Sequence, residues 1–195
     1  MAEREGWDAV TTRRLSAEIE YSQPVLYKHF ASIEDIVDAV ALEGFGDLAE
    51  VLAAARKAGA PGEALSRVAH AYSAFATENP ALYDAMFTRP TRLRFAVEDT
   101  PVQMSAGFDE LREALAAIAD GRDLDTLTEV AWAGLHGLTT LSRSGRLRPG
   151  YEAVRIRLFV DEFQRTRSQN SRRSKAGSTK PPEPSRRQTS RRSGK

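Results

Sequence analysis

The residues that point most clearly to a function lie between positions 11 and 30. A short helix predicted to follow Ser22 would carry on its polar side Gln23, Val25, Tyr27, Lys28 and His29. This arrangement is typical of a helix-turn-helix unit whose second helix enters the major groove of DNA. The segment therefore predicts recognition of double-stranded DNA.

Other site chemistries have little support. The chain has no cysteine, which excludes disulfides, thiolate metal ligands and a cysteine nucleophile. His29, His70 and His136 are isolated and form no HExxH-type pair, so we expect no metal site and no cofactor. No nucleophile stands beside a recognisable base, so we expect no catalytic residue and no enzymatic activity.

Two short helices must position the polar side of the segment that follows Ser22. Caps at Thr11 or Thr12 and at Ser22 predict helices through about Ile19 and Phe30, separated by a three-residue turn. The apolar residues spaced to form their shared core are Leu15, Ile19, Tyr21, Leu26 and Phe30. Because two helices of about eight residues are not stable alone, a third helix must support them.

These residues resemble the DNA-binding domain of the tetracycline-repressor (TetR/AcrR) family of transcriptional regulators. The resemblance covers about residues 6 to 50. It rests on Thr12, Ser22, Leu26, Tyr27, His29 and Phe30, followed by Ser32 and Glu34. A second, shorter element, Trp132-Ala133-Gly134-Leu135-His136-Gly137, is similar to the W-x-x-x-H-G element of one C-terminal class in this family.

The resemblance implies a role for each position of the motif. Thr12 would bind a phosphate and Arg13 a phosphate or a groove edge. Base edges would be contacted by Gln23, Pro24 and Val25, since glutamine can pair with adenine and valine can contact a thymine methyl. The DNA backbone would be held by Tyr27, Lys28 and His29.

The chain departs from the family pattern in three places that matter. Ile33 replaces a usual lysine, which deletes a positive charge near the DNA backbone. The first helix of the family is largely missing, since only residues 1–5 precede Gly6. A misassigned start codon is the plain explanation for the missing helix, and a natural truncation is the alternative. Glu20 occupies a turn position where the family usually has glycine, and a positive φ there costs another residue about 1 kcal/mol.

Helical spacing continues along the chain and predicts an all-α fold. Ser32 and Asp35 resemble a capping box that opens a long helix. We expect a helix-turn-helix domain over 1–49 and a helical ligand and dimerisation domain over 50–165. Residues 166–195, which lack large apolar side chains, are expected to form a disordered basic tail.

The charge is distributed unevenly between these segments. Residues 165–195 hold eleven basic residues and one acid, a net charge of +10, which leaves −9 for residues 1–164. Such a tail would strengthen DNA binding electrostatically or lie on the acidic body of the same protein. No signal-peptide core and no apolar run long enough to span a bilayer are present, so we expect a cytoplasmic protein.

The predicted ligand domain offers two further groups of candidates. An apolar ligand pocket could be lined by Tyr72, Phe75, Tyr83, Met86, Trp132 and His136, although residues of these types are more often plain core. A dimer interface could be formed by a stripe of Leu127, Ala131, Gly134 and Leu138, whose alternative is a contact within one chain.

Together these features predict a homodimeric transcriptional regulator that binds a palindromic operator. We expect a repressor released by a small apolar ligand, with ligand and DNA binding coupled through the long helix after the motif. The alternative is a dimeric helical ligand-binding protein that has lost specific DNA binding through loss of its first helix.

Overall fold

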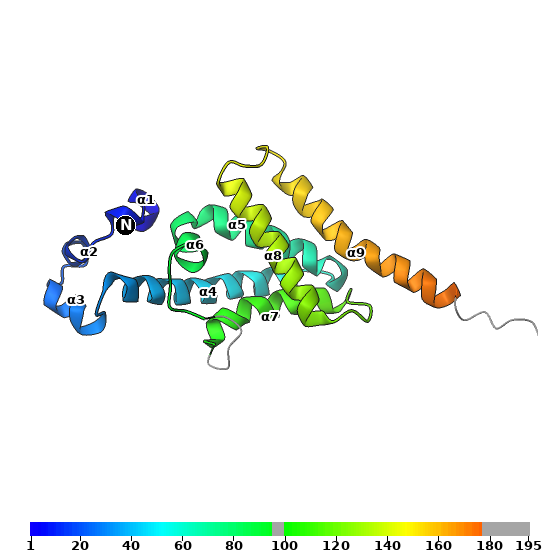
Figure 1. Ribbon diagram of the computed structural model, residues 1–195, viewed down its shortest axis with the longest axis horizontal. Coiled ribbons are helices and arrows are strands. Elements are labelled where there is room, and N and C mark those ends of the chain that lie inside the picture. The colour runs from blue at the N-terminus through cyan, green and yellow to red at the C-terminus, as the bar shows by residue number, and fades with distance from the viewer. Residues whose placement is uncertain (95–99, 177–195) are drawn as a thin grey trace, which may run out of the picture.

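The computed structural model describes residues 1–94 and 100–176, with side chains to residue 165, and all their regular structure is helical (Figure 1). This confirms the predicted all-α fold. No helix in this part of the chain is long and apolar enough to cross a membrane. In chain order the elements are α1 (Ala2–Glu5), η1 (Trp7–Ala9), α2 (Thr12–Glu18), α3 (Gln23–His29), α4 (Ile33–Lys57), η2 (Pro61–Glu63), α5 (Ala64–Glu78), α6 (Pro80–Phe87), α7 (Val102–Ala116), α8 (Leu124–Arg143) and α9 (Glu152–Ala176).

Side-chain caps fix where several helices begin. Thr11 Oγ1 accepts from the Arg14 amide at 3.2 Å at the start of α2. At the start of α4, Ser32 Oγ accepts from the Asp35 amide at 3.2 Å. The Asp35 carboxylate reaches back to the Ala31 amide at 2.8 Å, one residue earlier than in a standard capping box. These bonds satisfy amides that a helix start leaves without partners.

Helix α4 is the spine of the molecule and packs against α5, α6 and α7. Gly44 sets its distance from α6, because a Cβ at this position would lie 2.7 Å from Leu82 Cδ1 and 2.9 Å from Met86 Sδ. The absence of a side chain therefore lets the Leu82 and Met86 side chains of α6 lie directly against the α4 backbone. This close approach explains a glycine that costs stability in the middle of a helix.

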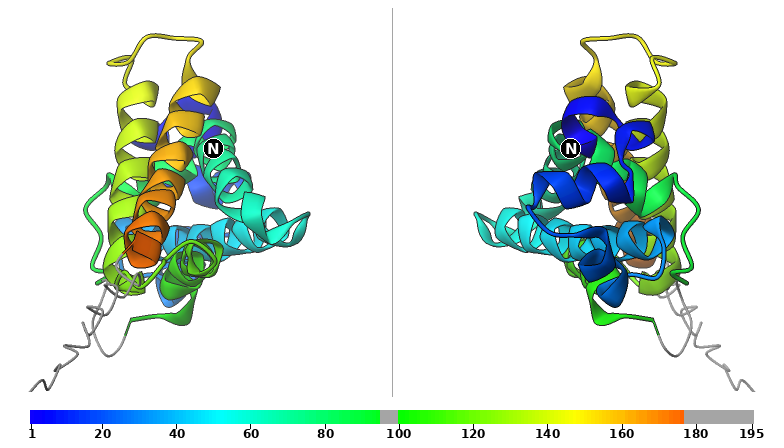
Figure 2. Two further views of the ribbon diagram at one scale, coloured as in Figure 1. Left: turned by 90° about the vertical axis from the view of Figure 1, so that its right-hand side faces the viewer. Right: turned by 90° about the vertical axis from the view of Figure 1, so that its left-hand side faces the viewer.

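The apolar core lies within the bundle of α4 to α9, and the right-hand view of Figure 2 shows the N-terminal segment in front of these helices. Its largest fully buried side chains are Tyr83, Leu65, Met104, Leu115, Leu135, Val68 and Thr128. Helix α4 runs without interruption across residue 50, where the sequence suggested a domain boundary. The bundle and the helix-turn-helix unit are therefore joined by a continuous helix.

The predicted shared core of α2 and α3 is wrong in part. Ile19 is 47% exposed and Tyr21 is 60% exposed, while Leu15, Leu26 and Phe30 are half-buried. The physical reason is that the four-residue α1 packs against α6 and leaves these side chains uncovered. Two expectations for the motif are confirmed: both helices have the predicted positions, and the turn has a positive φ of 58° at Glu20.

The end of the chain also differs from expectation. Helix α9 continues to Ala176, so the prediction of disorder from residue 166 is wrong for residues 166–176. Arginine, glutamine, lysine and alanine favour helix, and extending an existing helix by one residue is far easier than starting one. The remaining residues of the predicted tail, 177–195, lie outside the described residues.

Candidate nucleic-acid interface and ligand cavity

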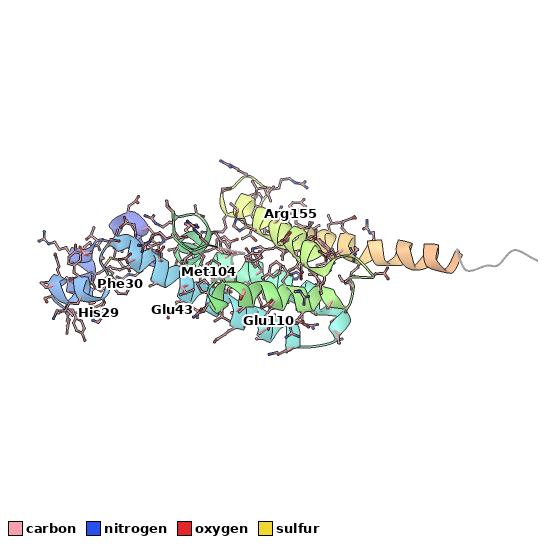
Figure 3. The ribbon with its side chains drawn as sticks, turned by 60° about the horizontal axis from the view of Figure 1, so that its bottom comes forward. His29, Phe30, Glu43, Met104, Glu110 and Arg155 are labelled. Carbon is pink, nitrogen blue, oxygen red and sulfur yellow. The ribbon has the colours of Figure 1, made fainter. Side chains whose placement is uncertain are left out.

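The helix-turn-helix unit lies at one end of the molecule, away from the C-terminal end of α9 (Figures 1 and 3). The two helices are joined by a hydrogen bond of 3.1 Å between the hydroxyls of Thr12 and Tyr27. This bond links the start of α2 to the last turn of α3. The outer side of α3 is therefore held in a fixed position relative to α2.

The sequence-predicted DNA contacts share this surface. Arg13, Gln23, Pro24, Tyr27, Lys28 and His29 are exposed, and Thr12 and Val25 are half-buried. In Figure 3, His29 and Phe30 lie near the tip of the unit. All eight predicted residues thus come from two adjacent helices and their side chains reach solvent.

Ion pairs divide the basic residues of this unit into two groups. Arg4 pairs with Glu18 at 2.9 Å and Arg14 with Glu5 at 2.6 Å. The hydrogen bond and charge of Arg14 hold the pKa of Glu5 below its ordinary value. Within the described residues, no ion pair involves Arg13 or Lys28. These two cations are therefore the ones available to phosphate.

A wide cavity of about 720 Å³ opens between α7 and α8. Its wall is largely aromatic and apolar, with two carboxylates and one imidazole. The lining residues are Phe87, Thr100, Met104, Ser105, Phe108, Asp125, Glu129, Trp132, Ala133 and His136. This volume is in the range that holds a drug-sized molecule.

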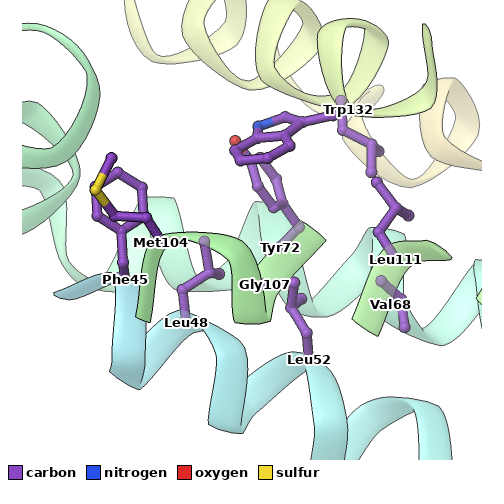
Figure 4. Close-up of a pocket in the computed structure, with 10 residues that line it drawn as sticks. Phe45, Leu48, Leu52, Val68, Tyr72, Met104, Gly107, Leu111 and Trp132 are labelled. Atoms are coloured by element: carbon purple, nitrogen blue, oxygen red, sulfur yellow. The ribbon is translucent and has the colours of Figure 1, made fainter. Parts of the chain in front are cut away.

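A second space lies deeper in the core, between α4, α5, α7 and α8 (Figure 4). Its volume of about 10 Å³ holds no more than about one water molecule. Met104 and Trp132 line both spaces, so they form part of the wall between them. Figure 4 shows the Tyr72 hydroxyl close to the Trp132 indole. Of these two spaces, the wide cavity alone is large enough to admit a ligand without rearrangement.

A buried polar cluster joins α5, α6 and α8 behind the wide cavity. The hydroxyls of Tyr72 and Tyr83 lie 2.9 Å apart, and the Tyr83 hydroxyl lies 2.7 Å from His136 Nδ1. Burial, followed by the charge of Arg143, lowers the pKa of His136, so the ring is neutral at pH 7. Burial raises the pKa of both tyrosines. Neutral His136 can therefore accept a hydrogen bond from the Tyr83 hydroxyl at Nδ1, and its Nε2 faces the Thr140 hydroxyl at 3.4 Å.

The sequence-predicted pocket residues are placed in three ways. Trp132 and His136 line the wide cavity, and Tyr72 lines the small one. Tyr83, Phe75 and Met86 line neither and belong to the core. Tyr83 is nevertheless linked to the wall of the wide cavity, because its hydroxyl is hydrogen-bonded to His136.

Sequence reasoning missed several residues of the cavity wall, above all Phe87, Phe108, Asp125 and Glu129. A signal for two of them was present, since Asp125 and Glu129 are spaced to share one side of a helix with Trp132. The wall residues of α7 carried no comparable signal, because Phe108 stands alone among small and polar neighbours.

Helix α1 and its neighbouring turn are fastened to α6. The carboxylate of Glu3 accepts two bonds from the first turn of α6, from the amides of Ala81 at 3.0 Å and Leu82 at 2.9 Å. The Trp7 indole donates to the Ala81 carbonyl at 2.8 Å, and the Arg89 guanidinium lies 5.4 Å from the centre of a Trp7 ring. We refer to the contacts of Glu3 and Trp7 with α6 as the α1–α6 latch. It joins the helix-turn-helix end of the chain to the bundle.

The stripe predicted as a dimer interface lies largely inside the chain. Leu127 and Ala131 are buried, and a Cβ at Gly134 would lie 2.7 Å from Phe159 Cε2 of α9. The intrachain alternative therefore holds for these positions. A different set of apolar side chains on α8, α9 and the segment between them is exposed: Val130, Leu141, Tyr151, Val154 and Leu158.

Two family models match the chain. Residues 1–40 match the model of bacterial regulatory proteins of the tetR family, and residues 65–161 match that of the tetracyclin repressor-like C-terminal domain. Together the two matches cover both the helix-turn-helix unit and most of the bundle. They confirm the family resemblance, while the finer similarity to the W-x-x-x-H-G element stays a prediction.

Two curated relatives are similar over most of the chain. An uncharacterised HTH-type transcriptional regulator of Mycobacterium tuberculosis, Rv0681, is 28% identical over 147 residues, which cover 73% of this chain and 65% of the relative. An uncharacterised HTH-type transcriptional regulator of Bacillus subtilis, YobS, is 32% identical over 148 residues, 72% of each protein.

Solved structures share the fold. A protein of unknown function from Rhodococcus sp. RHA1 superposes with a TM-score of 0.68 at 27% identity, over 85% of this chain and 88% of that one. The TetR family transcriptional regulator PfmR of Thermus thermophilus superposes with a TM-score of 0.59 at 19% identity, over 84% and 92%. The helix-turn-helix unit followed by a helical bundle is therefore an arrangement found in known proteins.

Proposed function

Because the chain belongs to the TetR family of bacterial regulatory proteins, we propose that it is a cytoplasmic transcriptional repressor that binds DNA as a homodimer and leaves it when a small molecule enters the bundle. The observation that carries this proposal is the exposed side of α3 at the end of the molecule. A helix side that carries Gln23, Tyr27 and Lys28 into solvent is arranged to enter a major groove.

The proposed division of labour follows from side-chain chemistry. Gln23, Pro24 and Val25 begin α3 and would face base edges. Lys28 and Arg13, which have no acidic partner among the described residues, would neutralise phosphates. The remaining predicted contacts, Thr12, Tyr27 and His29, would fix the register on the DNA backbone.

The dimer would form through the exposed apolar side of α8 and α9. Val130 is 58% exposed and Leu158 is 54% exposed. Exposure of apolar surface to water costs free energy, and burial against a second copy would remove that cost. On α9, Val154 and Leu158 are four residues apart and therefore lie on one side of the helix. A two-fold arrangement of this face would place two copies of α3 on one DNA duplex.

Two connections would couple ligand binding in the wide cavity to DNA binding. Helix α4 leads from the bundle directly into the recognition helix through a three-residue connection. The α1–α6 latch provides a second route, since α6 also carries Tyr83, which is bonded to His136 at the cavity wall. A ligand that displaces α6 would therefore change the position of the helix-turn-helix unit.

Selection from random duplex DNA with the full chain tests the proposal. We expect enrichment of an inverted repeat whose half-site centres lie about one helical turn apart. Gln23→Ala should relax base choice at one position in each half-site, with a loss of about 1–3 kcal/mol of discrimination. Lys28→Ala should weaken binding to all sequences and reduce the salt slope by about 1 per lost phosphate contact.

Lys57→Ala, at the far end of α4, is the matched control and should change neither property. Failure to enrich any sequence would favour the alternative, a helical ligand-binding protein without specific DNA binding. The observation behind that alternative is the exposure of Ile19 and Tyr21, which leaves the motif without a fully covered core.

A further inference from the structure

We propose that the wide cavity between α7 and α8 takes an organic cation with an apolar body, and that Glu129 is its counter-ion. This inference rests on the proposed function, because the cation would be the effector. It also replaces the apolar ligand expected from the sequence with a charged amphiphile.

The charges at the cavity wall carry the first part of the argument. Asp125 is already engaged by Arg112, whose Nε lies 2.5 Å from its Oδ1. Glu129 lies one turn further along α8, and within the described part of the chain it has no hydrogen bond or ion pair. The described lining residues include no lysine or arginine, and His136 is neutral at pH 7 because burial lowers its pKa. The wall therefore carries one uncompensated negative charge.

The aromatic side chains carry the second part. Trp132 and Phe108 have ring centres 5.7 Å apart, and Phe87 lies 6.4 Å from Trp132 in an edge-to-face arrangement. Aromatic faces attract cations, and quaternary ammonium groups are bound in this way in proteins. Trp132 lies three residues from Glu129 on the same side of α8, so a ring and a carboxylate can act on one cationic group.

The remaining wall suits an apolar body. Met104 and Ala133 add apolar surface beside the three aromatic rings. An anionic ligand would meet the repulsion of Glu129, and no basic residue among the described lining residues would offset it. A neutral apolar ligand would fit the rings but would leave the carboxylate without a partner. Charge complementarity therefore favours the cation.

Calorimetric titration of the full chain with three ten-carbon probes tests the proposal. Decyltrimethylammonium, 1-decanol and decanoate share one apolar chain, and each is used below the concentration at which it aggregates. We expect the cation to bind at least about tenfold more tightly than the alcohol, and the carboxylate to bind most weakly. Equal binding of the cation and the alcohol, or tighter binding of decanoate, would overturn the proposal.

Substitutions of Glu129 test whether its carboxylate causes the preference for the cation. Glu129→Gln should lower the affinity for the cation about tenfold and leave that for the alcohol unchanged, whereas Glu129→Asp should retain part of the preference. Glu50→Gln removes an exposed acid on α4 and is the matched control. In a Trp7→Phe background, quenching of the remaining tryptophan, Trp132, reports occupation of this cavity. An unchanged cation affinity in Glu129→Gln, or binding without quenching, would refute the assignment.

The titration needs no DNA, so its result is independent of the operator experiment. Specific DNA binding together with indifference to charge would refute only the ligand class. Preference for the cation without any DNA recognition would refute only the regulatory function.

Discussion

Glu3 should control how firmly the helix-turn-helix unit is attached to the bundle. Its carboxylate accepts from two amides in the first turn of α6, which otherwise lack helical partners. Glu3→Ala removes both bonds and the negative charge at the positive end of the helix. Trp7 and its bond to Ala81 remain, so the latch is weakened and not abolished.

The magnitude follows from capping energetics. Loss of a side-chain cap at a helix start costs about 0.5–2 kcal/mol. Because Glu3 is exposed, hydrogen bonds to water replace part of the two that Glu3→Ala removes. We therefore take about 1 kcal/mol as the loss in the free energy that holds the latch closed. A change of about 1.4 kcal/mol is tenfold in an equilibrium constant, so opening of the latch should become about fivefold more frequent. The double variant Glu3→Ala, Trp7→Phe should open the latch more often than either single variant.

Hydrogen exchange of individual amides measures this opening directly. In Glu3→Ala, the Ala81 and Leu82 amides should exchange about fivefold faster, while amides in the middle of α4 keep their rates. Glu5→Ala removes a neighbouring acid that binds Arg14 and not α6, so it should leave both α6 amides unchanged. Unaltered exchange of the two amides in Glu3→Ala would refute the latch.

Three further predictions concern the turn, the bundle and its buried imidazole. Glu20→Gly should raise stability by up to about 1 kcal/mol, because φ is 58° there, whereas Ala17→Gly inside α2 should lower it by about as much; urea denaturation measures both. Gly134→Ala should destabilise the chain by about 1–3 kcal/mol, because its Cβ would meet Phe159 at 2.7 Å; a variant as stable as the parent in the same assay would contradict this packing. His136 has a pKa lowered by burial from its ordinary value of 6.5, so the unfolded chain binds its proton more tightly. The stability from this group should be complete above about pH 6.5 and fall as pH drops below it, and thermal unfolding of His136→Gln should lack that part of the loss.

Local signals predicted the starts of α2 and α4, because each of these helices has its own capping residue. Thr11 and Ser32 cap the helices that follow them, whereas Ser22, the predicted cap of α3, makes no side-chain cap bond. Such signals act within a few residues, so they are visible in one sequence. The positive φ at Glu20 was equally local and was predicted through the family pattern.

Packing between distant segments could not be predicted in the same way. Gly134 was expected at a dimer interface because small residues permit close helix approach, but the sequence does not say which helix approaches. The α1–α6 latch joins residues nearly eighty positions apart, and nothing near Glu3 points to α6. The cavity was predicted in part, since Trp132 and His136 share a side of α8, while the facing residues of α7 depend on tertiary packing.

The contact between Gly44 and α6 has a consequence for the genetics of such a regulator. An alanine Cβ at this position would press on the side-chain ends of Leu82 and Met86, and larger side chains are expected to move α6, which holds both the latch and Tyr83. For the proposed repressor, mutants that express the target gene without inducer would therefore be expected at codon 44, remote from the recognition helix. An allelic series from alanine to valine should give graded expression. Because Gly44 lies outside the proposed dimer face on α8 and α9, such alleles of the proposed repressor should be dominant over the wild type through mixed dimers.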